Sequence, residues 1–381
     1  MRQIPVPRRP AARQSGSGHT GHGSESGRGA VEPVRIGVVG YGLGGRVFHT
    51  PLIASAPELE LVGVVTRDAD RRGQLEADHP GLAAYDDLRA LADAGAEAVA
   101  ISSPSGTHTR LTDEALALGL HVVCDKPLAL DAPSAAASIA KAADAGRILT
   151  AFQNRRWDSD FLTARRILDE GALGRVYRFE SRFERWSPGA PRAWWRAELP
   201  PEEGGGVRLD LMTHLADQAV QLFGPVTRVY AEIATRRSAS TADDDVVALL
   251  THADGTSSEL YANTMSGDPS RRMRLLGTEG AYVVGGVDGQ EEALRQGRTP
   301  ASEGSLWGRE PQTSWGRVVR GNEVTTIPTE RGRWDLFYPA FAAAVRGQGP
   351  LPVDPAEALG VLRVLDAVAT SAAEHRVVDV G

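Results

Sequence analysis

Up to residue 152, the chain alternates between short, almost wholly apolar segments and longer segments in which apolar residues recur at helical spacing. The apolar segments predict strands at residues 36–40, 59–65, 98–101, 122–124 and 148–152, with a weaker strand at 82–85. Helices are predicted between them, at residues 44–54, 68–78, 87–94, 107–118 and 131–145. Short strands that are apolar on both faces indicate a parallel sheet covered on both sides, and six of them fit a doubly wound α/β fold of the Rossmann type.

The second half of the chain has a different pattern. Residues 175–186 alternate between apolar and charged side chains, as in a strand with one solvated face. Further strands are predicted at residues 226–234, 246–251, 257–264, 272–276 and 281–284, and helices at 157–169, 334–345 and 354–373. Residues 285–332 are interpreted as irregular and glycine-rich. This order predicts an α+β region with a mostly antiparallel open sheet.

Residues 1–32 are rich in Arg, Ser, Gly, His and Pro and have no apolar periodicity, so they are expected to form a disordered tail. They lack the apolar centre of a secretory signal, and an extended start or an amphipathic transit peptide are the alternatives. The first domain is then expected at residues 33–152, ending with the last apolar strand, and the α+β domain at residues 153–381.

The composition is that of an ordinary globular protein: 381 residues, 41% hydrophobic and 24% charged, with a formal net charge of −7. The apolar fraction is sufficient for a core, and no apolar run of about 18 residues predicts a membrane span. A mildly acidic chain lacks the basic surface that nucleic-acid binding requires. The single cysteine, Cys124, excludes internal disulfides and cysteine-based zinc sites and fits a reducing cytoplasm.

A glycine-rich turn follows the first predicted strand and opens the first predicted helix. Gly40, Gly42 and Gly45 match the pattern G-x-G-x-x-G, with Tyr41 and Leu43 between them. The first glycine permits the tight turn, the second lets the backbone approach a pyrophosphate, and the third lets helix and strand pack closely. The helix N-terminus adds free N–H groups and partial positive charge. The first domain is therefore expected to bind a dinucleotide, and a purely structural glycine turn is the alternative.

The residues after the second strand indicate which dinucleotide is bound. Sites that prefer NAD place an Asp or Glu about 20 residues beyond the motif, where it holds the ribose 2′-hydroxyl. Thr66 and Arg67 stand there in this chain, and a hydroxyl with a guanidinium suits a 2′-phosphate. The sequence therefore favours NADP(H). NAD is the alternative, because Asp68 could reach the ribose instead of capping the next helix.

Lys126 is one of two lysines, with Lys141, among 42 lysine and arginine residues. It precedes Pro127 directly after the fifth strand, at the sheet edge where doubly wound folds bind ligands. Proline restricts the residue before it to an extended backbone, which aims this side chain rather than letting it begin a helix. A desolvated lysine can lose its proton and an arginine cannot, so Lys126 is a candidate catalytic residue. A surface lysine is the alternative.

Asp210 and His214 are four residues apart in a predicted helix and share one face. An Asp beside a His can orient the ring and raise its pKa, which suits proton transfer near neutral pH. A surface pair is one alternative, and a metal site that also uses His108 is another. No compact metal motif supports the metal site, and the absence of G-x-S-x-G argues against a serine hydrolase.

Together these residues resemble the Gfo/Idh/MocA oxidoreductase family, which includes glucose–fructose oxidoreductase and inositol dehydrogenase. The resemblance runs from about residue 34 to residue 378 and includes the segment Ser-Pro-Ser-Gly-Thr-His at 103–108. The family usually has Glu before its Lys-Pro pair, where this chain has Asp125. Residues 45–49 and 152–158 are similar to the subgroup of NADP-linked scyllo-inositol dehydrogenases.

The resemblance implies a two-domain enzyme that transfers a hydride between a sugar or polyol carbon and nicotinamide. Lys126 would polarise the reacting oxygen, His214 would be the acid/base, and Asp210 its partner near the substrate. The expected cofactor-binding residues are Gly40, Tyr41, Gly42, Leu43, Gly45, Thr66, Arg67, Ser103, Pro104, His108 and Lys126. The expected substrate-binding residues are Lys126, Asn154, Arg155, Trp157, Asp210 and His214, and no metal is expected. The open sheet would form a dimer or tetramer.

Two other functions stay open on the sequence. One is a sensor of the same fold that binds a dinucleotide and a partner protein without catalysis; it would not need Lys126, Asp210 and His214 together. The other is an oxidoreductase that acts on nucleotide-sugars, keto-sugars or dihydrodiols. In each enzymatic case the partner is a small molecule, and neither nucleic acid nor a membrane is expected.

Overall fold

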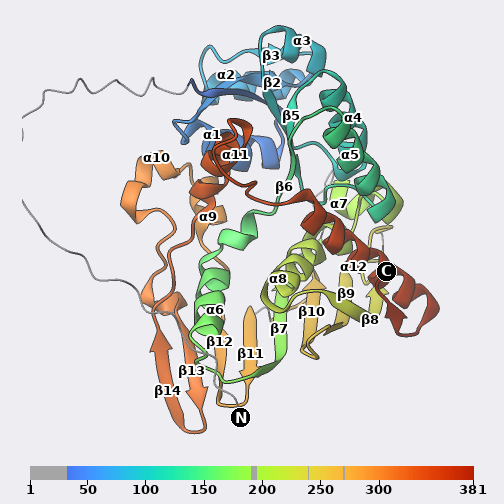
Figure 1. Ribbon diagram of the computed structural model, residues 1–381, viewed down its shortest axis with the longest axis vertical. Coiled ribbons are helices and arrows are strands. Elements are labelled where there is room, and N and C mark those ends of the chain that lie inside the picture. Colours follow the sequence, from blue (N-terminus) through green and yellow to red (C-terminus); the bar gives the residue numbers. More distant parts are fainter. Residues whose placement is uncertain (1–31, 190–194, 239, 269–270) are drawn as a thin grey trace, which may run out of the picture. The chain divides into compact units, whose positions relative to one another are not determined.

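The computed structural model of the protein describes residues 32–189, 195–238, 240–268 and 271–381 (Figure 1). Apart from Glu32, the tail expected at residues 1–32 lies outside these ranges. Two β-sheets organise the described residues, and helices pack on both of them.

The first sheet has six parallel strands in the order β3-β2-β1-β4-β5-β6, drawn in blue to green in Figure 1. They are β1 (Val34–Val39), β2 (Leu59–Val65), β3 (Ala84–Tyr85), β4 (Ala98–Ile101), β5 (His121–Asp125) and β6 (Leu149–Phe152). β4 and β6 are buried along their whole length, as expected for strands covered on both faces. The order is that of a Rossmann fold, in which the carboxyl ends of β1 and β4 open a crevice. The predicted first half is confirmed.

The helices between these strands begin close to the predicted positions. They are α1 (Thr50–Ala54), α2 (Ala69–Asp78), α3 (Leu88–Asp93), α4 (His108–Ala117) and α5 (Ala132–Asp144). Asp68, Asp87 and Asp131 cap α2, α3 and α5, since each carboxylate accepts a hydrogen bond from a backbone N–H of the first turn. The first helix departs from the prediction, because Gly44–His49 forms a widened π-helical turn before α1. Pro51 follows this turn and cannot donate a backbone hydrogen bond to the preceding turn.

The second sheet has nine strands in the order β14-β13-β12-β11-β7-β10-β9-β8-β15. They are β7 (Val176–Glu184), β8 (Val226–Ala234), β9 (Asp245–His252), β10 (Ser257–Asn263), β11 (Met273–Gly277), β12 (Gly280–Val284), β13 (Gly316–Arg320), β14 (Glu323–Ile327) and β15 (Val378–Asp379). β7 and β10 run parallel, and the other neighbours are antiparallel. This confirms the predicted mostly antiparallel sheet.

The prediction that residues 285–332 are irregular was wrong. They contain α9 (Gln290–Arg295), α10 (Pro300–Glu303) and the hairpin of β13 and β14. Gly321-Asn322 is a two-residue hairpin turn in which Gly321 has a φ of +57°. β14 is exposed along most of its length, so it shows no alternation of apolar and polar positions, which is the signal used for the other strands.

The remaining helices are α6 (Ser159–Asp169), α7 (Trp195–Glu198), α8 (Thr213–Phe223), α11 (Phe337–Val345) and α12 (Pro355–Glu374). α8 packs against β7 and β10 of the second sheet. α12 contacts α5 and β6 of the first half and β8 of the second sheet, as its path across Figure 1 shows. The Thr150 hydroxyl in β6 donates a 2.7 Å hydrogen bond to the carbonyl of Val353, just before α12. The last helix therefore connects the two sheets.

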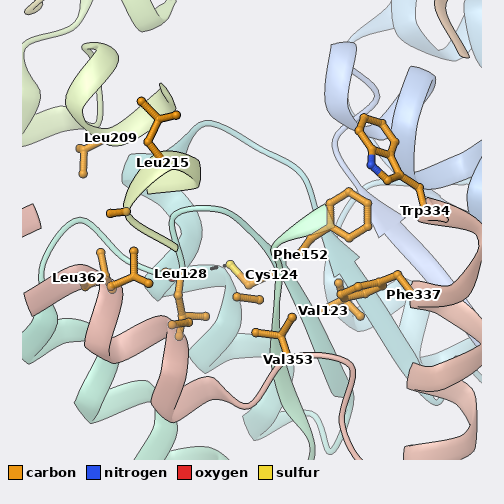
Figure 2. Close-up of a cluster of buried hydrophobic side chains, with 14 of the residues drawn as sticks. Val123, Cys124, Leu128, Phe152, Leu209, Leu215, Trp334, Phe337, Val353 and Leu362 are labelled. Atoms are coloured by element: carbon orange, nitrogen blue, oxygen red, sulfur yellow. Dashed lines mark hydrogen bonds between the residues drawn. The ribbon is translucent and has the colours of Figure 1, made fainter. Parts of the chain in front are cut away.

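The apolar core is continuous from the first sheet to α8 and α12. Figure 2 shows part of it, with the labelled side chains Val123, Cys124, Leu128, Phe152, Leu209, Leu215, Trp334, Phe337, Val353 and Leu362. Phe152, at the end of β6, meets Phe337 edge to face, with ring centroids 4.8 Å apart. Burial raises the pKa of the Cys124 thiol, so this cysteine behaves as a packing residue.

Arg272 is a buried arginine that links the second sheet to α6 and α8. Its Nε lies 2.9 Å from Asp160 Oδ2. Nη1 donates to the hydroxyl of Ser181 (2.6 Å) and Nη2 to Oε1 of Gln218 (2.7 Å). The guanidinium also lies 4.1 Å from the ring centroid of Phe183. A buried charge is tolerated only when it is paired and hydrogen-bonded, so these contacts fix both helices on the sheet.

We expect Arg272→Met to lower the free energy of unfolding by about 3–5 kcal/mol, because it leaves the Asp160 carboxylate buried without its partner. Urea unfolding followed by circular dichroism measures the change. Arg228→Met is the control: Arg228 is exposed on β8 and has no ion pair among the described residues, so we expect a change below about 0.5 kcal/mol. Equal effects of the two substitutions would contradict the role of Arg272.

Candidate active site

Three glycines in the turn after β1, Gly40, Gly44 and Gly45, have no space for a side chain. Gly40 has a φ of +90°, and a Cβ on it would lie 2.8 Å from the carbonyl oxygen of Ser102. A Cβ on Gly45 would lie 2.0 Å from the carbonyl oxygen of Gly40, and one on Gly44 would lie 2.2 Å from the Ser102 hydroxyl. Only glycine fits this backbone path, which leaves main-chain N–H groups accessible to an anion at the start of the helix.

A cavity of about 740 Å³ lies along the glycine turn, at the carboxyl ends of β1, β2 and β4. Eight of the expected cofactor-binding residues line it: Gly40, Tyr41, Gly42, Leu43, Thr66, Arg67, Ser103 and Pro104. Gly45 and His108 do not line it. The volume lies in the usual range for ligand sites, and the side-chain-free floor fits a pyrophosphate, so the residues present fit a dinucleotide.

Two arginines belong to the wall of this cavity next to β2. Arg67 is exposed, and its Nε donates a 2.9 Å hydrogen bond to the carbonyl of Asp86. Arg71 lies beside it, one helical turn into α2. Asp68, the acid that could hold a ribose, caps α2 by accepting a 3.0 Å hydrogen bond from the N–H of Arg71. Thr66 completes this part of the wall.

His108 is buried behind the loop that follows β4. Its Nδ1 lies 2.7 Å from the carbonyl oxygen of Pro127 and its Nε2 lies 2.9 Å from that of Ser103. The ring therefore ties this loop to the carbonyl of Pro127, the residue that follows the cis Lys126–Pro127 peptide bond. Burial lowers the pKa of His108. Both ring nitrogens are engaged with main-chain oxygens, so His108 supports the cavity wall and is not placed as a metal ligand.

A second cavity, of about 470 Å³, adjoins the first, because Leu43, Gly44, Asp125 and Arg196 line both. Five of the expected catalytic and substrate-binding residues line it: Lys126, Asn154, Arg155, Asp210 and His214. They come from the ends of β5 and β6 and from the π-helical turn Arg208–Met212 that runs into α8. The structure therefore brings these widely separated residues together beside the dinucleotide-sized cavity.

Lys126 and Asp210 form the central contact of the smaller cavity. The lysine Nζ lies 2.7 Å from the Asp210 carboxylate and 2.5 Å from its main-chain oxygen, and Arg196 Nε reaches the same carboxylate at 3.1 Å. Burial lowers the pKa of Lys126 in spite of the adjacent anion. Burial alone would raise the pKa of Asp210, but the two cations hold it well below its usual range. Asp210 is therefore ionised at neutral pH.

His214 differs from the expectation in its electrostatics. The ring is buried, and its Nδ1 has no hydrogen-bond partner among the described residues. Burial lowers the pKa of His214 well below its usual value, and the nearby Lys126 and Arg155 cations lower it further. The Asp210 charge raises the pKa of His214, as expected, but burial and the cations outweigh it. No hydrogen bond joins the two side chains among the described residues, because the Asp210 carboxylate is engaged by Lys126 and Arg196 instead. His214 is a neutral imidazole at pH 7.

Asp125 lies between the two cavities and contacts a buried histidine. His49 Nε2 lies 3.6 Å from the Asp125 carboxylate, and His49 Nδ1 lies 2.6 Å from the hydroxyl of Tyr338. Burial raises the pKa of Asp125, but His49 and the Lys126 ammonium outweigh it and hold the value at about 2. The His49 ring also stacks at 4.4 Å on Phe152. Asp125 is thus a fixed anion next to Lys126.

Arg155 is held in the wall of the smaller cavity. It pairs with Asp158 (3.2 Å) and with Glu291 (2.8 Å), and its guanidinium lies 4.8 Å from the ring centroid of Phe183. Trp157 is placed differently from the expectation. It does not line the cavity and instead packs on Phe337, with ring centroids 5.8 Å apart.

The smaller cavity also contains residues that the sequence did not single out as site residues: Asp125, Arg185, Ser187, Arg196, Glu291, Arg295 and Trp334. Arg185 could have been recognised from the sequence. It lies an even number of residues after Phe179 and Phe183, whose side chains face inward from β7, so the same alternation directs its side chain inward. Glu291 and Arg295 lie in the segment interpreted as irregular, where no periodic pattern connects them to the site.

The described residues contain neither a cluster of metal-binding side chains nor a membrane-spanning helix. No three His, Cys, Asp or Glu side chains there are grouped as a metal site would require. Among the same residues, no helix combines the length and apolar character needed to cross a membrane.

The fold and the paired cavities define an oxidoreductase with an NAD-binding Rossmann domain. The family described as "Oxidoreductase family, NAD-binding Rossmann fold" (GFO/IDH/MocA) matches residues 34–153, and the "GFO/IDH/MocA C-terminal domain" matches residues 161–283. The chain therefore belongs to the Gfo/Idh/MocA family, as its sequence indicates.

Individual relatives agree with this assignment. The chain is 34% identical to the oxidoreductase YdgJ of Escherichia coli (strain K12), itself described as uncharacterized, over 90% of this chain and 97% of that protein. It is 30% identical to the scyllo-inositol 2-dehydrogenase (NADP(+)) IolW of Bacillus subtilis (strain 168), over 92% of this chain and 97% of that protein. The solved structure of the Bacillus subtilis protein yvaA has a TM-score of 0.85 at 29% identity and covers 93% of this chain and 100% of that chain.

We expect His214 to stay neutral from pH 6 to pH 8, because burial and neighbouring cations lower its pKa. Proton–nitrogen correlation spectra of the histidine rings, recorded as a function of pH, measure this, and the spectrum of His214→Gln identifies the signal. Lys126→Met should raise the pKa of His214, because it removes one of the cations that lower it. A wild-type His214 signal that titrates near 6.5 would contradict the prediction.

Proposed function

We propose that this protein oxidises a hydroxyl group of a polyol, cyclitol or sugar, or reduces the corresponding ketone, by hydride transfer with NADP(H). The observation that carries the proposal is the convergence of the Lys126 ammonium, the Asp210 carboxylate and the His214 imidazole on one cavity that adjoins the glycine-lined one. The relative named scyllo-inositol 2-dehydrogenase (NADP(+)) supports both the substrate class and the cofactor.

The proposed chemistry needs one hydride acceptor and one proton acceptor. The nicotinamide of the bound cofactor supplies the hydride acceptor, and the protein supplies the rest. A neutral His214 accepts the hydroxyl proton as the C–H bond breaks, and returns it in the reverse reaction. Lys126 donates a hydrogen bond to the reacting oxygen and stabilises the negative charge that develops on it. Asp210 keeps that ammonium protonated and oriented, through the 2.7 Å contact.

The preference for NADP(H) is supported by the wall of the larger cavity near β2. Arg67 and Arg71 lie there with Thr66. Of the acids on this wall, Asp68 caps α2, Asp87 caps α3 and Asp86 pairs with Arg72. Guanidinium groups bind phosphate through charge-assisted hydrogen bonds. Arg67 is exposed, so its guanidinium is free to move toward a 2′-phosphate.

We expect Lys126→Arg to lower kcat about 100-fold or more, because arginine keeps the charge but its planar guanidinium cannot take the position of the compact ammonium beside Asp210. The assay follows the absorbance of reduced nicotinamide with a panel of cyclitols, polyols and sugars. Lys141→Arg is the matched control, since the only other lysine is exposed and paired with Asp113 on the surface; it should leave kcat unchanged. Near-normal turnover of Lys126→Arg would refute the proposed role.

We expect Arg67→Ala to raise KM for NADP⁺ about 10- to 100-fold and to leave KM for NAD⁺ within about 2-fold, because only NADP⁺ carries the phosphate that the guanidinium binds. Initial rates at saturating substrate measure both constants. Arg89→Ala, an exposed position on α3 that does not line the cavity, is the control. Equal changes in KM for NADP⁺ and NAD⁺ would show that Arg67 does not bind the 2′-phosphate.

We further propose that copies of the chain associate through the exposed face of the second sheet. Leu249 on β9 and Tyr177 on β7 are each 43% exposed there. Most homo-oligomers have closed symmetry, so this face of one copy would meet the same face of a second copy around a twofold axis.

A further inference from the structure

The smaller cavity is lined by more positive than negative side chains. Its cations are Lys126, Arg155, Arg185, Arg196 and Arg295, and its carboxylates are Asp125, Asp210 and Glu291. With His214 neutral, five cations face three anions. A neutral polyol does not need this excess, because hydroxyl groups are bound by hydrogen bonds and do not require a counter-charge.

Two of the three carboxylates are each engaged by two cations. Arg196 and Lys126 both contact Asp210. Glu291 is shared by Arg155 and Arg295, each at 2.8 Å. Every cation in the cavity except Arg185 therefore contacts a carboxylate.

Arg185 is the cation whose charge no carboxylate contacts. Its guanidinium has no ion pair and no hydrogen bond among the described residues, and its side chain is exposed to the cavity. Arg185 lines the same cavity as Asp210 and Glu291, and its charge contributes to lowering the pKa of both carboxylates.

The backbone of Arg185 is fixed although its side chain is not paired. Its N–H donates a 2.8 Å hydrogen bond to the carbonyl of Asn263, and its own carbonyl accepts one of 3.0 Å from the N–H of Ser266. These bonds continue the pairing of β7 with β10, so the position is held by the sheet. Arg185 also does not line the larger cavity, and the phosphates expected at the glycine turn therefore do not account for it.

We propose that Arg185 binds a carboxylate of the substrate, so that the substrate class is an anionic sugar or polyol derivative such as a hexonate or hexuronate. The inference rests on the proposed function, because it assigns a ligand to the same cavity. A planar guanidinium matches a carboxylate through two parallel hydrogen bonds. A volume of about 470 Å³ holds a six-carbon acid. The paired arginines around the cavity add to the favourable potential without competing for the ligand.

The test compares each hexonate and hexuronate of a panel with its neutral polyol or aldose, in the presence of NADP⁺. We expect kcat/KM to be at least about 10-fold higher for one acid than for its neutral counterpart, and the difference to shrink with added salt. Arg185→Gln should raise KM for that acid about 10- to 100-fold and leave KM for neutral substrates within about 2-fold. Arg185→Lys should restore part of the affinity.

Arg182→Gln is the matched control for this substitution. Arg182 lies on the same strand but on the opposite face, where its guanidinium lies 3.8 Å from the ring centroid of Tyr261. It should leave every KM unchanged. Calorimetric titration of the acids into the protein saturated with NADPH, in which oxidation cannot proceed, gives a readout that does not depend on turnover.

The outcomes separate the two proposals. If neutral substrates are oxidised as well as the acids and Arg185→Gln changes neither, the carboxylate site is overturned while the proposed function stands. If the acids bind in an Arg185-dependent way but nothing is oxidised, the carboxylate site stands and the proposed function falls. If no acid of the panel binds or reacts, the carboxylate site is overturned.

Discussion

A buried ammonium group needs an anion beside it, and the way this protein supplies one determines how its two halves meet. Lys126 lies just after β5, and its anion is Asp210, 84 positions later in the chain. Nζ contacts both the carboxylate and the main-chain oxygen of Asp210, so the turn that opens α8 is fixed against the edge of the first sheet. Separating the partners would leave a poorly solvated charge, at a cost of several kcal/mol. The contact that shapes the site is thus also a structural link between the sheets.

The same contact decides what His214 can do. Because Asp210 is engaged by two cations, it offers His214 no hydrogen bond, and the ring experiences mainly burial and positive charge. A histidine in that setting is neutral at pH 7, so one of its ring nitrogens can accept a proton. Asp125 belongs to the wall that the two cavities share. Its carboxylate is held in place by His49, which in turn contacts the hydroxyl of Tyr338. The protonation states of His214 and Asp125 are therefore determined by residues from other helices and strands.

The sequence predicted the fold more completely than the site. Strands buried on both faces and aspartates at helix starts are local signals, and they located the first sheet and its helices. The exposed strand β14 carries no such signal. The local sequence feature that indicates its hairpin is the Gly321-Asn322 turn, which the prediction did not use. In the site, the spacing of Asp210 and His214 correctly placed both in one cavity but did not indicate the partners of the Asp210 carboxylate. The partner of Asp210 comes from β5, and no local pattern indicates contacts between elements so far apart in the chain.

The cavity separates groups that keep their charge from groups that can lose it. Arginine stays protonated in proteins, so the four arginines around the smaller cavity provide a constant positive field that holds carboxylates. Lys126 and His214 are the two groups there whose pKa is lowered by burial, and both line the smaller cavity. In a chain that uses arginine at nearly every basic position, a lysine at this point gives a compact amine that a carboxylate can keep charged. A guanidinium there would fill more of the cavity and would place its charge differently against Asp210. The division of roles therefore follows from side-chain chemistry together with burial.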